Sequence, residues 1–212
     1  MNILMIKAND RPANESVSSR MFETFLKEVE NNPELNVRIY DIFKEDMPYI
    51  GQDLFNAYGK MALGETLNEV EQRLMTANQK ARDAFSEADV IVIAFPLWNL
   101  TIPARLQTFI DYVFSAGFTF KYDEAGNMVQ LQPDKKVILL NARGGIYSTV
   151  EMQSMEMSVN YLRNVFAGMF GNEILAEVVI EGHNSMPDQA NNIIAEGLER
   201  VKEAARQLST LS

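Results

Sequence analysis

Cysteine is absent from this sequence, and its absence removes several classes of function. Disulfide frameworks, thiolate zinc sites, iron–sulfur clusters and cysteine nucleophiles all need cysteine side chains. A chain without thiols suits a reducing compartment, so we expect a cytoplasmic protein. A chain of 212 residues needs no disulfide or metal cross-links for stability, because at this size about 70% of the unfolded surface is buried on folding. We therefore expect one domain that spans residues 1–212.

Signals for a membrane, a secretory route or a nucleic-acid partner are also missing. The amino terminus, Met1-Asn2-Ile3-Leu4-Met5-Ile6, begins like a strand and lacks the basic start of a signal peptide. No apolar run approaches the ~20 residues that a membrane-spanning helix needs. The formal net charge is −10 and the pI is near 4.7, whereas a nucleic-acid-binding protein usually has a basic face. We expect a soluble protein with no membrane or nucleic-acid partner.

Several catalytic and nucleotide-binding motifs do not occur. None of the 11 glycines forms the Gly-x-Gly-x-x-Gly pattern of a Rossmann dinucleotide site. There is neither a Walker A lysine motif nor a Gly-x-Ser-x-Gly nucleophile elbow. The pair Phe95-Pro96 stands where a receiver-like protein would carry its phosphoacceptor aspartate. We expect no metal site and no catalytic dyad.

The pattern that is present alternates apolar, strand-like runs with longer amphipathic stretches. Four of the five predicted strands are continuous apolar runs, as expected when helices cover both faces of a parallel sheet. The second strand alternates apolar and polar residues, which is typical of a sheet edge. Successive strand–helix units with right-handed crossovers predict an α/β doubly wound, five-stranded parallel sheet with strand order 2-1-3-4-5. The predicted strands are 3–7, 36–41, 89–95, 136–141 and 174–181, and the predicted helices are 16–31, 66–86, 103–116, 150–170 and 188–208.

Two insertions interrupt this pattern. Residues 42–64 are too many for an ordinary connection between a strand and a helix. Residues 118–132 hold two strand-like runs around Glu124-Ala125-Gly126-Asn127, which predicts a hairpin. Between the insertions, Thr66-Leu67-Asn68-Glu69 matches a capping box, so a helix is predicted to begin there.

Three loops are candidates for a ligand site. In open α/β sheets ligands bind beyond the carboxyl ends of the strands, where the chain order reverses. For the predicted order this point lies between the first and third strands. The loops of interest are therefore 9–15, 96–102 and 143–148.

The first two loops offer different chemistry. Ser16-Val17-Ser18-Ser19 begins a helix, where free N–H groups and hydroxyls favour a phosphate. The alternative is that Ser16 only caps the helix. In the second loop, Pro96 and Pro103 stiffen a segment that contains Trp98, the one tryptophan. This segment predicts a wall for a flat cofactor, and the alternative is a tryptophan that simply packs the loop.

The last loop and the single histidine each allow more than one role. Gly144 and Gly145 allow the backbone to approach a ligand closely, and Arg143 could supply positive charge at the rim. The alternative is a tight turn with a surface arginine. His183 follows the fifth strand and could be a base, a rim contact or a loop brace, of which we favour the brace.

Four segments together resemble one known family. They are Phe95-Pro96-Leu97-Trp98-Asn99-Leu100-Thr101-Ile102-Pro103-Ala104, Asn141-Ala142-Arg143-Gly144-Gly145-Ile146-Tyr147-Ser148, Ala116-Gly117 with Thr119-Phe120-Lys121-Tyr122, and Glu181-Gly182-His183-Asn184. They resemble the FMN-dependent NADH azoreductases of the flavodoxin-like fold, also described as FMN-dependent NADH:quinone oxidoreductases. The start, Lys7-Ala8-Asn9-Asp10-Arg11-Pro12, looks like members from Gram-positive bacteria. The resemblance covers essentially the whole chain.

The resemblance implies a bound FMN and a set of residues around it. The serines that begin the first helix would hold its phosphate, together with Asn9, where many members have a serine. The tryptophan segment would line the isoalloxazine ring, and residues 141–145 would flank the ring's polar edge. Some members have serine where this chain has Ala142, so a hydroxyl contact is lost there, although backbone contacts can survive. The implied cofactor residues are Asn9, Ser16, Val17, Ser18, Pro96, Leu97, Trp98, Asn99, Leu100, Asn141, Ala142, Arg143, Gly144 and Gly145, and the substrate slot would use Trp98, Phe120, Tyr122 and Tyr147.

The resemblance also implies an activity and a partner. NADH or NADPH would reduce FMN, and a quinone or aromatic azo compound would then take two electrons in the same slot, a ping-pong sequence. The flavin performs the redox chemistry, so no protein acid or base is required. Family members are homodimers, and an apolar surface on predicted helix 150–170 fits this, with a wide buried stripe as the alternative. That surface would comprise Met152, Met155, Met157, Met169 and Phe170.

Two other functions are weaker interpretations of the same residues. A flavodoxin-like electron carrier would have shorter loops than residues 42–64 and 118–132 provide. A hydrolase built on an early serine and His183 would need an Asp-x-x-His spacing, but position 180 is Ile180.

Overall fold

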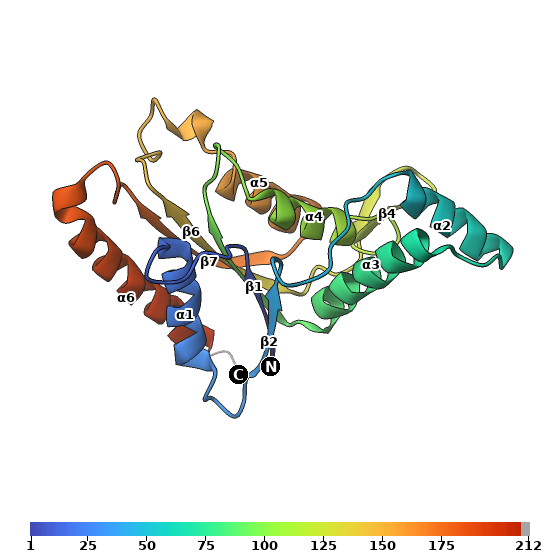
Figure 1. The fold of residues 1–212 in the computed structure, drawn as a ribbon, viewed down its shortest axis with the longest axis horizontal. Coiled ribbons are helices and arrows are strands. Elements are labelled where there is room, and N and C mark those ends of the chain that lie inside the picture. The colour runs from blue at the N-terminus through green and yellow to red at the C-terminus, as the bar shows by residue number, and fades with distance from the viewer. Residues whose placement is uncertain (209–212) are drawn as a thin grey trace.

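The structure is a computed structural model that describes residues 1–208; residues 209–212 of the expected domain lie outside the described residues. Its centre is a parallel sheet in the order β2-β1-β3-β6-β7 (Figure 1). This order confirms the predicted 2-1-3-4-5 arrangement and places the alternating strand at the edge. The strands are β1 (Asn2–Lys7), β2 (Asn36–Asp41), β3 (Val90–Pro96), β6 (Lys136–Arg143) and β7 (Glu173–Glu181).

Helices cover both faces of the sheet because the central strands are apolar on both sides. Ile3 and Met5 point to the face covered by α1 (Val17–Val29) and α6 (Ala190–Leu208). Leu4 and Ile6 point to the opposite face. That face is covered by α3 (Glu69–Glu87), α4 (Ala104–Val113) and α5 (Val159–Arg163) (Figure 1). Within residues 1–208 none of these helices is long and apolar enough to cross a membrane.

Both insertions form local structure. Residues 42–64 contain α2 (Gln52–Leu63), which projects to the right in Figure 1 and ends at Gly64 with a left-handed φ of 71°. Residues 118–132 form the predicted hairpin, in which β4 (Phe120–Tyr122) pairs antiparallel with β5 (Met128–Gln130). The hairpin follows α4, which returns the chain from the carboxyl edge of the sheet to the amino edge.

One predicted helix is much shorter than expected. Residues 150–158 contain only the 3₁₀ turn η1 (Gln153–Met155), α5 begins at Val159, and the helix continues with π geometry as η2 (Asn164–Met169). The reason is Glu156, whose carboxylate accepts the N–H groups of Ser158 and Val159 at 2.8 and 2.9 Å and so caps the helix there. The methionines at 152, 155 and 157 therefore do not share a helix with Met169 and Phe170, contrary to the prediction.

The expected capping box is displaced by two residues. The side chain of Asn68 accepts the Glu71 N–H at 2.9 Å, and the Glu71 carboxylate accepts the Asn68 N–H at 2.9 Å. The helix therefore begins at Glu69. Asn68 caps the helix in place of Thr66 because its capping-box partner, Glu71, is also buried in an ion pair with Lys60.

Candidate functional site

A cavity of about 390 Å³ lies beyond the carboxyl ends of β1, β3 and β6, at the point where the chain order reverses. The three predicted loops supply eight of its 17 lining residues. Nine of the residues implied by the resemblance line it: Asn9, Ser16, Val17, Ser18, Pro96, Leu97, Trp98, Ala142 and Gly144. The cavity also takes residues outside the implied cofactor set: Arg11, Asn14, Glu15, Arg20, His183, Asn184, Ala190 and Ile194.

One end of the cavity is a cluster of hydroxyls at the start of α1. The amide of Asn9 donates to the hydroxyls of Ser16 and Ser18 at 2.8 and 2.9 Å, and these two hydroxyls lie 3.2 Å apart. Ser16 also accepts the Ser19 N–H at 3.3 Å, so it does cap the helix. Capping and ligand binding are compatible, because the first N–H groups of a helix have no carbonyl partner within it. This end has the donors and the helix dipole that suit an anion.

Two nitrogen-bearing side chains outside the implied cofactor set also reach this end, and one of them, Arg20, carries a positive charge. Arg20 lies four residues after Ser16, on the same face of α1, and its Nε is buried. His183 reaches the cavity from the loop after β7, and its Nδ1 is buried too. Among residues 1–208, neither nitrogen has a hydrogen-bond partner. Burial lowers the pKa of His183, and the charge of Arg20 lowers it further, so the ring is held neutral.

The other end is the wall made by the turn after β3. Leu97 continues the sheet by donating its N–H to the Ala142 carbonyl at 2.8 Å. Trp98 and Thr101 then exchange two backbone hydrogen bonds of 3.0 Å around a two-residue turn. Asn99 and Leu100 adopt φ values of 50° and 70°, a left-handed conformation that two-residue hairpin turns require.

This turn divides the predicted ring contacts. Trp98 is 37% exposed and lines the cavity, as do Pro96 and Leu97. Asn99 lines a neighbouring hollow of about 620 Å³, which Phe43 and Trp98 also border. Asn99 is therefore not part of the cavity lining, and its contact with a ring stays a prediction.

The loop after β6 contributes backbone more than charge. Gly144 lines the cavity, and a Cβ there would lie 2.3 Å from Nδ2 of Asn184, so glycine permits this close approach. Asn141 is fully buried and donates to the Phe95 carbonyl at 3.2 Å. Arg143 was expected as a rim charge, but the structure buries it and pairs it with carboxylates.

Two acidic side chains hold Arg143 in place. Its guanidinium lies 3.6 Å from Glu156 and 3.4 Å from Glu181, and its Nε donates to Asn141 at 2.6 Å. Glu156 comes from the stretch just before α5, and Glu181 comes from the end of β7. Arg143 therefore fixes neighbouring loops and does not line the cavity; Gly145 is also outside the lining.

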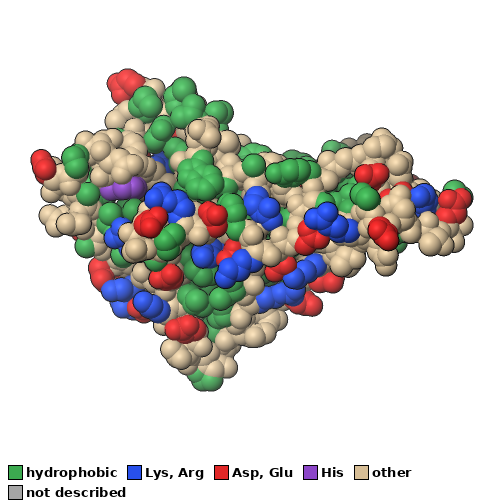
Figure 2. All heavy atoms as spheres, viewed as in Figure 1, with side chains coloured by type: hydrophobic (Ala, Val, Ile, Leu, Met, Phe, Trp, Pro, Cys, Tyr) green, Lys and Arg blue, Asp and Glu red, His purple; other side chains and the backbone are tan. Residues whose placement is uncertain are grey.

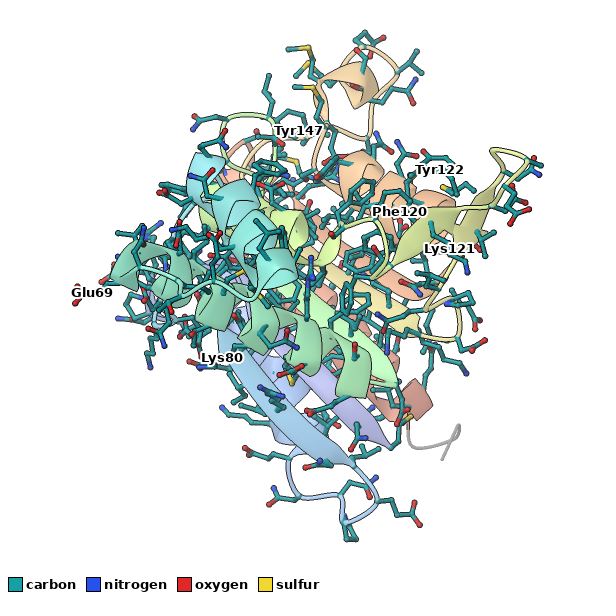
Figure 3. All side chains as sticks on the ribbon, turned by 90° about the vertical axis from the view of Figure 1, so that its right-hand side faces the viewer. Glu69, Lys80, Phe120, Lys121, Tyr122 and Tyr147 are labelled. Carbon is teal, nitrogen blue, oxygen red and sulfur yellow. The ribbon has the colours of Figure 1, made fainter. Side chains whose placement is uncertain are left out.

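The aromatic side chains of the expected slot do not meet within one chain. Phe120 packs on Phe114 and Tyr122, with ring centroids 5.4 and 5.9 Å apart. Figure 3 shows Phe120 and Tyr122 on the hairpin and Tyr147 on a separate segment. None of the three lines the cavity with Trp98.

A larger hollow lies away from the strand ends. It measures about 710 Å³ and is formed by residues of α2, α3, α4, α5 and η2. Its lining is mainly apolar and includes Leu54, Phe55, Ile110, Val165 and Met169. Phe55 is 63% exposed, so this face presents a large aromatic side chain to its surroundings.

The chain is similar to known proteins over nearly its full length. A family model for the flavodoxin-like fold matches residues 1–205. FMN-dependent NADH:quinone oxidoreductase 1 of Bacillus subtilis (strain 168) is 45% identical over 204 residues, which cover 96% of this chain and 97% of that protein. FMN-dependent NADH:quinone oxidoreductase 1 of Listeria monocytogenes serovar 1/2a is 48% identical over 206 residues, covering 97% and 98%.

Solved structures agree with these matches. The azoreductase from Bacillus anthracis str. Sterne superposes with a TM-score of 0.88 at 45% identity, covering 97% of this chain and 99% of that one. An FMN-dependent NADH-azoreductase from Bacillus anthracis str. Ames Ancestor, solved in complex with FMN, gives a TM-score of 0.86 at 26% identity, covering 98% of each chain.

Proposed function

The chain belongs to the family of FMN-dependent NADH:quinone oxidoreductases with the flavodoxin-like fold, and we propose that it uses FMN to transfer two electrons from NADH to quinones and aromatic azo compounds. The observation that carries the proposal is the cavity at the switch point of the sheet. It joins a hydroxyl-rich, cationic end to an apolar wall that ends in Trp98. FMN has the matching halves, a phosphate and a flat ring.

The phosphate would bind at the start of α1. The hydroxyls of Ser16 and Ser18 are already oriented by Asn9. The buried Nε of Arg20 and Nδ1 of His183, which have no partner among residues 1–208, fit an anion that neutralises the first and accepts from the second. Charge-assisted hydrogen bonds of this kind are about twice as strong as neutral ones.

The ring would lie against the turn after β3. Leu97 and Trp98 supply apolar and aromatic surface, and Gly144 leaves the backbone of the last loop accessible. Ala142 lines the cavity without a hydroxyl, so polar contacts to the ring edge would come from backbone N–H groups in this loop. Asn99, Leu100, Asn141, Arg143 and Gly145 would support the loops from behind.

The bound FMN would supply the redox chemistry, a hydride from NADH in one half-reaction and two-electron reduction of the acceptor in the other. The protein residues would bind and orient the two flat substrates in turn, which is a ping-pong sequence. Trp98 is exposed enough to contact an incoming ring. No protein side chain has to donate a proton, since water reaches the open side of the wall. The absence of cysteine supports a cytoplasmic location for this reaction.

We propose that the protein is a homodimer and that the partner completes the slot. The hairpin with Phe120 and Tyr122 lies at the opposite end of α4 from Trp98, so a slot with these aromatic residues requires a second copy. Tyr122 is 62% exposed, which suits an intersubunit contact. The apolar hollow beside Phe55 gives the two copies a surface on which to pack.

Mixed dimers test this arrangement directly. Trp98→Ala and Phe120→Ala chains are prepared separately, unfolded together and refolded. If each slot takes Trp98 from one chain and Phe120 from the other, half of the molecules contain one intact slot, and about a quarter of wild-type activity returns. If both residues act within one chain, every slot carries a substitution and mixing restores nothing.

The activity itself is tested by steady-state kinetics. Initial rates of NADH oxidation at several concentrations of a benzoquinone, and separately of an azo dye, should give parallel double-reciprocal lines. Intersecting lines would contradict alternating use of one slot. Failure to oxidise NADH with either acceptor, although FMN binds, would favour an electron carrier instead.

A further inference from the structure

The turn that carries Trp98 is strained and needs outside support. Leu100 adopts a φ of 70°, which for a side chain of its size costs about 1–2 kcal/mol. Such conformations persist only when the surrounding structure holds them. The hydrogen bonds between Trp98 and Thr101 close the turn but do not fix it relative to the rest of the molecule.

The support comes from residues 150–158. The N–H of Met157 donates to the Leu100 carbonyl at 2.9 Å. This segment projects beyond the sheet at the top of Figure 1 and contains only the 3₁₀ turn η1. Figure 2 shows hydrophobic side chains over it, and Met157 itself is 49% exposed. The side chain is therefore not what holds Met157; its backbone position must be set by its neighbours.

Met157 lies between Glu156 and Ser158, and the Glu156 side chain holds both of these residues in place. This carboxylate accepts the N–H groups of Ser158 and Val159 and the Ser158 hydroxyl, and it lies 3.6 Å from Arg143. Burial alone would raise the pKa of Glu156, but these hydrogen bonds and the Arg143 charge outweigh it and lower the pKa below its usual value. The group stays charged at neutral pH, although only 5% of it is exposed.

The ion pair is better suited to fixing geometry than to adding stability. Burying two charges costs about as much as their attraction returns, so a buried pair contributes little net free energy. Its directional contacts, however, tie α5, β6 and the Trp98 turn to one another. Arg143 is oriented in turn by Asn141 and Glu181.

We propose that Glu156 is a positioning residue for Trp98. Held by Arg143, it fixes Met157, whose N–H fixes the Leu100 carbonyl and thereby the angle at which the indole faces the cavity. The catalytic part of this inference rests on the proposed function, because it assumes that Trp98 contacts the flavin or its substrates. The positioning part does not, since it concerns the protein alone.

The test uses the fact that Trp98 is the only tryptophan. Its fluorescence in flavin-free protein therefore reports this turn without interference. In Glu156→Gln, acrylamide quenching of Trp98 should rise about twofold as the turn loosens. In the flavin-loaded protein, the KM for a benzoquinone should rise about tenfold while kcat changes little, because a slot displaced by part of an ångström binds less well.

Glu177→Gln is the matched control. It removes the Glu177–Arg163 ion pair of 2.7 Å, which also involves α5 but does not lead to the turn. Quenching and KM should stay at wild-type values in this variant. If Glu156→Gln lowers the melting temperature yet matches Glu177→Gln in quenching, the carboxylate only stabilises the helix and the proposal is wrong.

A second pair of variants decides the matter if Glu156→Gln does not fold. Met157→Pro removes the N–H that reaches Leu100, and the extended ψ of 99° at Glu156 suits a following proline. Met157→Ala keeps the N–H. Quenching should rise in the proline variant alone, and equal quenching in both would overturn the proposal. Failure of the wild-type protein to bind FMN would refute the proposed function and leave the quenching result standing.

Discussion

Arg20 offers a measurement of the phosphate site in isolation. Its Nε is buried at the cavity without a partner among residues 1–208, whereas Arg11, the other arginine of the lining, is exposed. A hydrogen bond from a charged group contributes about 1.5–3 kcal/mol. Arg20→Gln should therefore raise the Kd for FMN by about 10- to 150-fold, since 1.4 kcal/mol is a factor of ten.

Riboflavin makes this prediction specific. It has the ring of FMN but no phosphate, so its affinity should change less than about twofold in Arg20→Gln. Both affinities are measured by quenching of flavin fluorescence at fixed ionic strength. Arg38→Gln, which removes a charge from an exposed ion pair with Glu87, should leave both unchanged. Equal weakening of FMN and riboflavin by Arg20→Gln would refute the assignment of this end to the phosphate.

Three further variants have defined outcomes. Trp98→Ala should lower FMN affinity and quinone turnover about tenfold or more through lost stacking; unchanged flavin content and turnover would exclude its role. The folded-state pKa of Glu156 lies below its usual 4.5, so its stabilisation is complete above about pH 5 and is lost as the pH falls through 4.5 toward the folded value. The difference in unfolding free energy between wild type and Glu156→Gln, measured in urea, should therefore shrink from pH 7 to pH 4, and a constant difference would contradict this. Gly197→Ala would place a Cβ 2.4 Å from Ile180, so overpacking of about 2–3 kcal/mol should exceed the gain of about 1 kcal/mol in helix propensity and lower stability by urea denaturation; a stabilised variant would contradict it.

The fold was predictable because its signals are local and repeated. Continuous apolar strands such as 90–94 require cover on two faces, and the alternating strand at 36–41 requires an edge, which together determine the sheet. The three ligand loops followed from the topology. The hydroxyls of Ser16 and Ser18 followed from the chemistry of a helix start.

What could not be predicted depends on contacts between distant segments. The sequence alone predicts that Arg143 is a rim charge, because only the folded chain brings Glu156 and Glu181 beside it. The carboxylate of Glu156 also delays the start of the predicted helix from residue 150 to Val159, because a capping glutamate two residues ahead of Ser158 has no clear sequence signature. Arg20 lies one helical turn after Ser16, so the sequence could have indicated it as a residue of the phosphate site. The same spacing is also typical of a surface residue on an amphipathic helix, which is why it gives no clear signal.

Anaerobic reduction of the bound flavin by NADH is a direct test of the proposed activity. The purified protein is loaded with FMN, and its visible spectrum is recorded before and after one equivalent of NADH without oxygen. The expected result is a flavin spectrum that bleaches promptly and returns when a quinone is added. Bound flavin that ignores NADH would contradict the proposed enzyme, and a protein that takes up no FMN would contradict the assignment of the cavity between Ser16 and Trp98.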